Sequence, residues 1–282
     1  MNSPALAAWL AAARQSAQQP PSRPRLPLLV AGQAVGSVED GVLGQIGLQR
    51  LLDKRFKLSK EEWNGAAAWH LGTAEVAGAA PAAPASVTEA LNALAAALRL
   101  QGTCGPWRNE QLAVPNAAGA VIGTVERGAV RVLGIATRAV HLVGLAPDGR
   151  MWLQKRAQTK PNNPGMWDTL MGGMVSAADS LAQALARETW EEAGLRVDHL
   201  QALQHGGHVD FGHPSREGGG AGYMRERIDW YRAVVPLGVE PVNQDGEVEC
   251  FELLPLDAVR ARMAEGAFTL EAALVIAGFL GE

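Results

Sequence analysis

Three glutamates lie near the end of one predicted helix, in a pattern suited to holding a cation. Glu188, Glu191 and Glu192 are three and one residues apart, and these spacings bring side chains onto one face of a helix. Carboxylates placed so closely repel one another, and a divalent cation removes that repulsion. Carboxylate oxygens and water are the ligands that Mg²⁺ and Mn²⁺ prefer. The pattern therefore predicts a Mg²⁺ (or Mn²⁺) site formed by these three residues, whereas an ordinary exposed helix explains them only singly.

The segment around these glutamates carries the start and stop signals of a helix. Ser176 followed by Asp179 fits a capping box and predicts a helix that begins near Ala177. Gly194 predicts its end, because glycine commonly follows the last turn. Arg187 stands beside the carboxylates, and we expect it to pair with Asp179 and fix their geometry.

The whole stretch closely resembles the Nudix box, Gly-x5-Glu-x7-Arg-Glu-U-x-Glu-Glu-x-Gly-U, in which U is a bulky aliphatic residue. The matching residues are Gly173, Arg187, Glu188, Glu191, Glu192, Gly194 and Leu195. Asp179 stands in place of the first glutamate and Thr189 in place of an aliphatic residue, and neither is a predicted metal ligand. The resemblance implies a Nudix α/β/α sandwich around a mixed sheet. It also implies hydrolysis of a small-molecule diphosphate that is linked to another group.

The expected chemistry assigns roles to four residues. Divalent cations neutralise the diphosphate and lower the pKa of a bound water. We expect Glu191, Glu192 or another box carboxylate to take the proton from that water, or a carboxylate from elsewhere such as Glu247. Glu247 and Glu249 alternate onto one face of a predicted strand, and we prefer Glu247. Arg187 is the fourth catalytic candidate.

Residues before the box are candidate contacts with the substrate. Arg156 and Lys160 either bind the substrate diphosphate or form a solvated strand end, and the two interpretations carry equal weight. Gly173 belongs to a predicted glycine turn that the substrate approaches closely. Trp167 either stacks on a heteroaromatic group or anchors the core against the box helix, and we favour the core. Asp168 is expected to orient the glycine turn through backbone N–H groups.

Histidines and cysteines carry weaker signals. His205 and His208 are three apart in a predicted strand, which places them on opposite faces. We therefore interpret them, with His213, as structural or rim residues rather than zinc ligands. Cys250 has no positive partner nearby in the sequence and is expected to be buried packing.

Composition limits the class of protein. Of the 282 residues, 48% are hydrophobic and 19% charged, which predicts a packed globular chain. A formal net charge of −4 argues against a nucleic-acid binder that relies on a basic surface. Two widely separated cysteines suit a reducing cytoplasm. Since no apolar run approaches the roughly 20 residues of a membrane span, no membrane partner is expected. The apolar N-terminal run is interpreted as an amphipathic helix with Leu6, Trp9, Leu10 and Ala13 on one face, rather than as a signal peptide.

Changes in residue pattern along the sequence divide the chain into two predicted domains. Residues 1–125 are expected to form a smaller α+β domain, and residues 126–282 the Nudix domain. The first is predicted to contain a hairpin over 26–38, helices over 40–53 and 87–98, and a loop rich in Ala, Pro and Gly over 76–86. The second is predicted to contain strands over 134–145, 151–155, 200–207, 228–235 and 247–253, a mobile loop over 215–222, and helices over 255–265 and 269–280.

Further segments extend the resemblance beyond the box. They are residues 105–110, 126–129, 140–142, 164–168 and 245–249. They are similar to segments of the subfamily related to the Nudix portion of fungal thiamine pyrophosphokinase, which has plant and bacterial members. That similarity implies hydrolysis of thiamine diphosphate, or of its damaged oxo and oxy forms, to the monophosphate. The first domain is then expected to shape the pocket or a homodimer.

Two alternatives stay open at the level of sequence. An isomerase of isopentenyl diphosphate shares the Nudix fold, but its chemistry needs a cysteine for proton transfer at carbon, and none lies near the box. A non-catalytic sensor of a nucleotide diphosphate often lacks a box carboxylate or adds a DNA-binding helix pair. Here all three glutamates are present and no basic recognition helix is visible.

Overall fold

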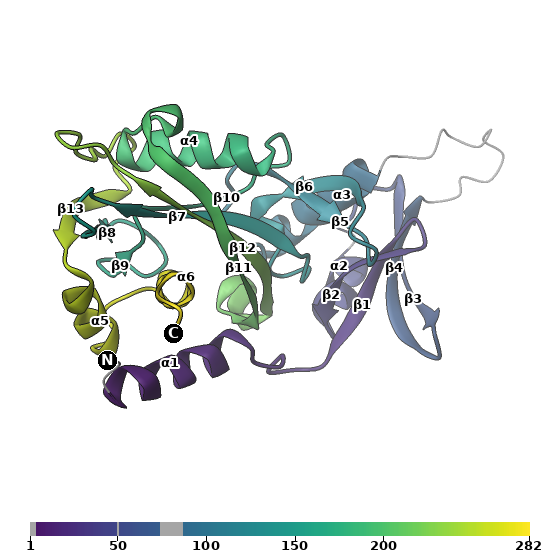
Figure 1. Ribbon diagram of the computed structural model, residues 1–282. Coiled ribbons are helices and arrows are strands. Elements are labelled where there is room, and N and C mark those ends of the chain that lie inside the picture. Colours follow the sequence, from purple (N-terminus) through teal and green to yellow (C-terminus); the bar gives the residue numbers. More distant parts are fainter. Residues whose placement is uncertain (1–3, 50, 74–86) are drawn as a thin grey trace.

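The fold combines two sheets with helices on their faces, as Figure 1 shows for the computed structural model of the chain. Residues 4–49, 51–73 and 87–282 are described by the structure. The loop expected over 76–86 lies outside these described residues. The α/β class is confirmed, and so is an α+β region that precedes a mixed-sheet sandwich.

The first region is built around a small sheet with strand order β2-β1-β4-β3. Its strands are β1 (Arg25–Val30), β2 (Gln33–Glu39), β3 (Phe56–Trp63) and β4 (Ala66–Thr73). The helices are α2 (Val42–Gln49) and α3 (Val87–Gln101), followed by a hairpin of β5 (Gln111–Pro115) and β6 (Val121–Glu126) and by the short η1 (Arg127–Ala129). The hairpin expected over 26–38 is confirmed. The helix expected over 40–53 is shorter, and that expected over 87–98 extends by one turn.

The second region is a mixed sheet with strand order β11-β12-β7-β8-β13, in which β10 pairs with β7 and β9 with β8. The strands are β7 (Thr137–Leu145), β8 (Met151–Arg156), β9 (Trp167–Asp168), β10 (Met171–Met174), β11 (Gln201–Ser215), β12 (Gly222–Val234) and β13 (Val248–Leu254). Strands β12 and β7 run parallel, and the other pairs are antiparallel. This pairing makes the sheet mixed, as predicted.

Helices cover the two faces of this sheet. Helix α4 (Leu181–Ala193) lies on one face, and α6 (Leu270–Leu280) on the other, beside α5 (Leu256–Ala264) (Figure 1). Strand alternation explains the two layers. On β7, Val140 and Leu142 pack in the cluster that contains α4, whereas Ala139 and Val143 pack in the cluster that contains α6. The apolar periodicity therefore produces an α/β/α sandwich.

Helix α1 (Pro4–Ala17) packs on the second region although it begins the chain. Leu6, Leu10 and Ala13 are buried, which confirms the predicted apolar face. They belong to the cluster that contains α5 and α6. After the helix, the Gln19 N–H donates to the carbonyl of Gly212 on β11 (2.7 Å). The division at residue 125 stays a prediction, but α1 contributes to the core of the Nudix part.

The connection between β11 and β12 is shorter than the mobile loop expected over 215–222. Strands β11 and β12 extend to Ser215 and from Gly222, and the short η3 (Glu217–Gly220) joins them. Gly218, Gly219 and Gly220 have φ values of 62°, 68° and 90°, a left-handed region that favours glycine. The glycines therefore build a tight connection between two long strands instead of a long loop.

The burial of α1 predicts a large effect from a single truncation. Leu10→Ala should lower the free energy of unfolding by about 2–4 kcal/mol, because it leaves a cavity between α1 and the C-terminal helices. Leu100→Ala is the matched control, since Leu100 is 72% exposed and should change stability by less than about 0.5 kcal/mol. Urea unfolding of the full chain measures both. Equal effects of the two substitutions would contradict the packing of α1.

Candidate active site

Helix α4 begins later than its sequence suggested. Ser180, not Ser176, is the N-cap: its hydroxyl accepts from the Gln183 N–H (3.3 Å), and the Gln183 side chain accepts from the Ser180 N–H (2.9 Å). The predicted cap at Ser176 and start near Ala177 are wrong, because Ser176 and Asp179 instead close a turn before the helix. Gly194 ends the helix in a left-handed conformation (φ 62°), as predicted.

Glu192 is the buried carboxylate of the site. Its Oε2 accepts from the Gly172 N–H (3.0 Å) and from Gln154 Nε2 (2.9 Å), so it ties α4 to β10 and β8. Burial raises the pKa of Glu192 to about 7, and the charge of Glu188 adds to that rise. The two hydrogen bonds and the charge of Lys160 oppose it. A carboxylate in this position is half neutral at pH 7 unless a cation is present.

Arg187 orders the remaining carboxylates. Its Nε donates to Asp179 (3.0 Å), which confirms the predicted pair despite the shorter side chain. Its Nη1 donates to both Glu188 (2.9 Å) and Glu191 (3.1 Å). Its Nη2 donates to the carbonyl of Met174 (3.3 Å). One guanidinium therefore links the turn before α4, the helix and β10.

Gly173 lies under the carboxylate of Glu188. A Cβ at this position would lie 2.0 Å from Glu188 Cδ, so any other residue would displace the Glu188 carboxylate. At Gly172, a Cβ would lie 2.7 Å from the ring of His141. The predicted glycine turn is wrong, because both residues belong to strand β10 and pair with β7. Glycine is required here by close packing of side chains on the strand.

The three glutamates fit a divalent cation by chemistry, but their side chains do not converge. Within residues 4–49, 51–73 and 87–282, no group of three or more Asp, Glu, His or Cys side chains is arranged to hold a metal ion. Glu188 and Glu191 point to Arg187, and Glu192 points to the backbone of β10. The oxygen donors of these carboxylates are of the kind that suits Mg²⁺ or Mn²⁺. Their roles as metal ligands stay predictions.

Lys160 and Glu247 meet beside this cluster. The Lys160 ammonium forms an ion pair with the Glu247 carboxylate. Burial lowers the pKa of Lys160, and the charge of Glu192 opposes that shift. Glu247 directly precedes β13, and its carbonyl accepts from the Ala157 N–H (2.9 Å). By contrast, Glu249 lies 2.8 Å from Lys155. Of the two glutamates considered, Glu247 is therefore the one that faces Lys160.

Arg156 is buried to the same degree as Lys160. Its Nη1 donates to Asp168 (3.3 Å) and its Nη2 to the carbonyl of Asn162 (3.2 Å). Asp168 also accepts from the Thr169 N–H (2.9 Å) and from the Thr269 hydroxyl (3.3 Å). The predicted contact of Asp168 with the glycine segment is wrong, because the Gly172 N–H donates to Glu192 instead.

Trp167 is a core residue on the face opposite to the box helix. It packs against the cluster that contains α1 and α6, and the guanidinium of Arg262 lies 4.3 Å from its ring centroid. The expected anchor against α4 is therefore wrong. Alternation along the two-residue strand β9 directs Trp167 away from α4.

The histidines lie in separate surroundings. His205 Nε2 is 3.4 Å from Asp229, and His208 Nε2 is 3.6 Å from Asp210. His213 Nδ1 is 2.9 Å from the carbonyl of its neighbour Pro214. Cys250 is exposed, so its predicted burial is wrong. It lies on β13, the edge strand of the sheet.

Gln154 is a site residue that the sequence analysis missed. It is buried on β8 and donates to Glu192 from the opposite side of the helix–sheet interface. The only signal was a polar residue inside an apolar strand, Met151–Arg156. Arg127 was also missed, although it lies in one of the segments that carry the family resemblance.

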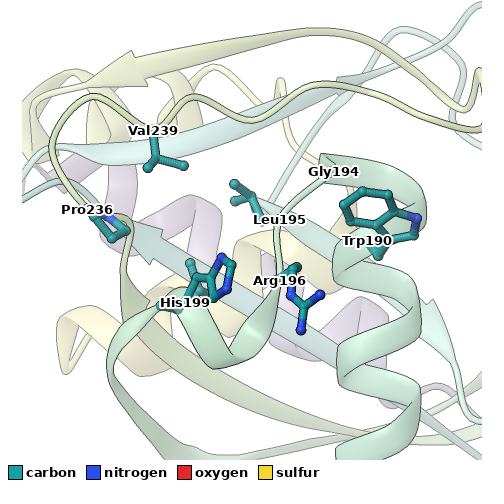
Figure 2. A pocket seen from close by; sticks show the side chains of 8 residues that line it. Trp190, Gly194, Leu195, Arg196, His199, Pro236 and Val239 are labelled. Atoms are coloured by element: carbon teal, nitrogen blue, oxygen red, sulfur yellow. The ribbon is translucent and has the colours of Figure 1, made fainter.

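A separate hollow lies behind the end of α4. A cavity of about 280 Å³ lies between the helix end, η2 (Val197–His199) and the chain at Pro236 and Val239. Figure 2 shows the side chains that line it. Trp190 lines it and is 51% exposed. Arg187 and the three glutamates are not among its lining residues, so this hollow is distinct from the carboxylate site.

The sandwich, the carboxylate helix and the glycine pair on β10 form an α/β fold with a predicted cation site. Residues 136–274 match the family model of the NUDIX domain, and the chain therefore contains a NUDIX domain. Among the described residues, none of the helices has the length and apolarity to cross a membrane.

Similar proteins include two from Arabidopsis thaliana. Nudix hydrolase 20, chloroplastic, is 32% identical over 181 residues, which cover 61% of this chain and 46% of that protein. Nudix hydrolase 24, chloroplastic, is 29% identical over 164 residues, which cover 56% and 43%. The chain thus spans less than half the length of these relatives. A crystal structure of DR0079 from Deinococcus radiodurans aligns with a TM-score of 0.45 and 21% identity, covering 57% of this chain and 92% of that one.

The raised pKa of Glu192 predicts how stability depends on pH. The folded protein holds this proton up to a pH of about 7, whereas the unfolded chain releases it near the ordinary glutamate value. Between these values the folded state binds more protons, so stability falls as pH rises. In EDTA, the free energy of unfolding should drop by roughly 2–3 kcal/mol from pH 5 to pH 8 because of this group.

Glu192→Gln should remove this pH-dependent contribution, because an amide does not titrate. Urea unfolding of both proteins at pH 5, 6, 7 and 8 measures the difference. A constant difference between wild type and Glu192→Gln at all four pH values would show that Glu192 has an ordinary pKa in the folded protein.

Proposed function

We propose that this protein is a divalent-metal-dependent hydrolase that cleaves a diphosphate by attack of water on phosphorus. The observation that carries the proposal is Glu192, a buried carboxylate tied to the backbone of β10 on the helix that also carries Glu188 and Glu191. Burying a carboxylate with two hydrogen bonds and no ion pair among the described residues costs stability. We take that cost as a sign that the carboxylate has a function. Its position in a NUDIX domain, with relatives named as hydrolases, supports a catalytic use.

The residues of the site have distinct proposed roles. Bound Mg²⁺ or Mn²⁺ supplies charge neutralisation and a more acidic water, with Glu188, Glu191 and Glu192 as the groups that would hold it. Arg187 orients the carboxylates from the turn at Asp179.

Basic and acidic groups beside the helix complete the site. Lys160 and Arg156 are proposed to bind the substrate diphosphate. Glu247, now paired with Lys160, becomes available to accept a proton from the attacking water when Lys160 binds phosphate. The general base is thus proposed to be Glu247 or one of the box glutamates.

The proposed substrate is thiamine diphosphate or one of its oxidised analogues, cleaved to the monophosphate. Its support is the resemblance of segments outside the box, above all residues 105–110 and 126–129. We further propose a reducing compartment such as the cytoplasm, because Cys104 and Cys250 are both free. A homodimer stays a prediction.

The isomerase alternative is not favoured. The two Arabidopsis relatives are named hydrolases. The alternative of a non-catalytic sensor predicts binding of a nucleotide diphosphate without turnover, and the following experiment separates it from the hydrolase.

Phosphate release with Mg²⁺ across thiamine diphosphates, nucleoside diphosphate derivatives and nucleotide sugars tests the proposal. Glu191→Gln and Glu192→Gln should each lower turnover by two or more orders of magnitude, since each removes a charge from the predicted cation site. Glu240→Gln, on an exposed loop, is the matched control and should keep full activity.

Two results would contradict this proposal. Near-normal turnover in both site variants would mean that the cation is held elsewhere. Fast turnover of a nucleotide sugar with no reaction of any thiamine diphosphate would refute the substrate assignment while leaving the hydrolase.

A further inference from the structure

Two segments that resemble the subfamily, residues 105–110 and 126–129, cross each other in the folded protein. The Gly105 N–H donates to the carbonyl of Gly128 (2.8 Å). A Cβ at Gly128 would lie 2.7 Å from the carbonyl oxygen of Pro106, and a Cβ at Gly105 would lie 2.9 Å from that of Gly128. Both glycines are therefore needed for the two chains to approach so closely.

A buried carboxylate fixes this crossing. Glu126 is 1% exposed, and its Oε1 accepts from the backbone N–H of Arg108 (2.7 Å) and of Gly128 (3.3 Å). The Arg127 N–H donates to the carbonyl of Glu110 (2.8 Å). Two arginines from segments about 20 residues apart, Arg108 and Arg127, are thus held at one place.

The crossing lies against the Nudix box. The Ala177 N–H, in the turn before α4, donates to the carbonyl of Gln111 (2.8 Å), which directly follows one of the crossing segments. Met174 packs against the hydrophobic core of the first region, and its carbonyl accepts from Arg187. The box strand is therefore in direct contact with this region, and Arg187 is linked to it through Met174.

Most hydrogen-bond donors of Arg127 have no partner among the described residues. The Arg127 side chain is 36% exposed and makes one ion pair, to Glu110 (2.7 Å). Since a guanidinium has five N–H donors, most of them stay available.

Arg108 adds a second cationic group. It is exposed, and its guanidinium makes no hydrogen bond or ion pair with the residues that the structure describes. Both Arg108 and Arg127 act on the carboxyl of Glu217, whose pKa is raised by burial and lowered in part by these charges. Arg108 and Arg127 thus add two cationic groups at the crossing that contacts the box strand, in addition to Lys160, whose charge acts on Glu192.

We propose that Arg127 and Arg108 form a subsite for the terminal phosphate of a diphosphate monoester. A guanidinium matches the oxygens of a phosphate in a two-pronged geometry. A terminal phosphate offers three free oxygens and more negative charge than an esterified one, so the subsite selects monoesters over substrates whose two phosphates are both esterified. The proposal rests on the proposed diphosphate hydrolase and adds a substrate class to it.

Binding of methylenediphosphonate, a diphosphate analogue that is not hydrolysed, tests this subsite. Calorimetry is done on the full chain with saturating Mg²⁺. Arg127→Gln should weaken binding by roughly ten- to a hundredfold, the effect of losing hydrogen bonds to a charged group, and Arg108→Gln should weaken it in the same direction. Arg150→Gln, in an exposed turn with its own partner Asp148, is the matched control and should bind like wild type.

The substitution Glu110→Gln distinguishes phosphate binding by Arg127 from a purely structural ion pair between Arg127 and Glu110. If Arg127 binds phosphate, releasing it from Glu110 should leave binding unchanged or tighten it. If the pair is only structural, Glu110→Gln and Arg127→Gln should lose thermal stability and ligand binding equally, which would overturn the proposal. Binding of Mg²⁺ alone should be the same in Arg127→Gln and wild type. A loss there would show that Arg127 acts through the cation site instead.

The P,P′-dimethyl ester of methylenediphosphonate tests the selection of a terminal phosphate. Wild type should bind it more weakly than the free diphosphonate, and Arg127→Gln should weaken it little further. Equal weakening of both ligands would overturn the terminal assignment. Failure of the proposed function looks different: a chain that hydrolyses no diphosphate but still binds the analogue through Arg127 keeps the subsite and loses the hydrolase.

Discussion

The buried carboxylate of Glu192 is the interaction on which the site depends. It lies beneath the helix that carries it, and it accepts hydrogen bonds from the Gly172 N–H of β10 and from Gln154 of β8. These bonds fix how α4 is turned about its axis on the sheet. With that rotation fixed, Arg187 and Glu188 lie over β10, because they occupy neighbouring positions on the same helix. The hydrogen bonds that compensate for the burial of Glu192 therefore also orient the other carboxylates of the cluster.

Close contact between α4 and β10 requires small residues on the strand. Glu188 can lie on the backbone only because Gly173 has no side chain, and Gly172 meets the ring of His141 on β7 in the same way. The two glycines in sequence looked like a turn because turns are the usual place for such pairs. In the fold they lie within strand β10, with Glu188 packed on one face and His141 on the other. The Nudix box thus combines a helix and the strand it covers.

Sequence patterns predicted contacts between residues close in sequence and failed for contacts between distant elements. The pair of Asp179 and Arg187 and the end of α4 at Gly194 follow from local spacing, and both are confirmed. The N-cap was placed four residues early, although Ser180 and Gln183 also fit a capping box. The choice between the two serines depends on where the preceding turn meets β5, which no local pattern contains.

The same reasoning applies to the fold as a whole. The family resemblance predicted the sandwich, and alternation along the strands explains it, since each apolar face needs a covering layer. The apolar face of α1 was predicted, but not that its partners are α5 and α6, at the far end of the chain. Trp167 was assigned to the core, but a two-residue strand gives too little alternation to choose a face. Gln154 reaches the carboxylate helix from an element distant in sequence, so its role appears only in three dimensions.

The arrangement of the two regions bears on how substrates are distinguished. In the proposed hydrolase, every diphosphate presents similar oxygens to the carboxylate helix, so the helix alone would select a reaction rather than a substrate. Discrimination has to come from groups at the edges of the cluster. One edge belongs to the Nudix sheet, through Lys160. The other is built by the crossing at Gly105 and Gly128, which reaches the box strand through the packing of Met174. Met174 directly follows Gly173, so the residue that packs on the first region lies one peptide bond from the glycine beneath Glu188. The first region is therefore placed to act on the chemistry of the site as well as on access to it.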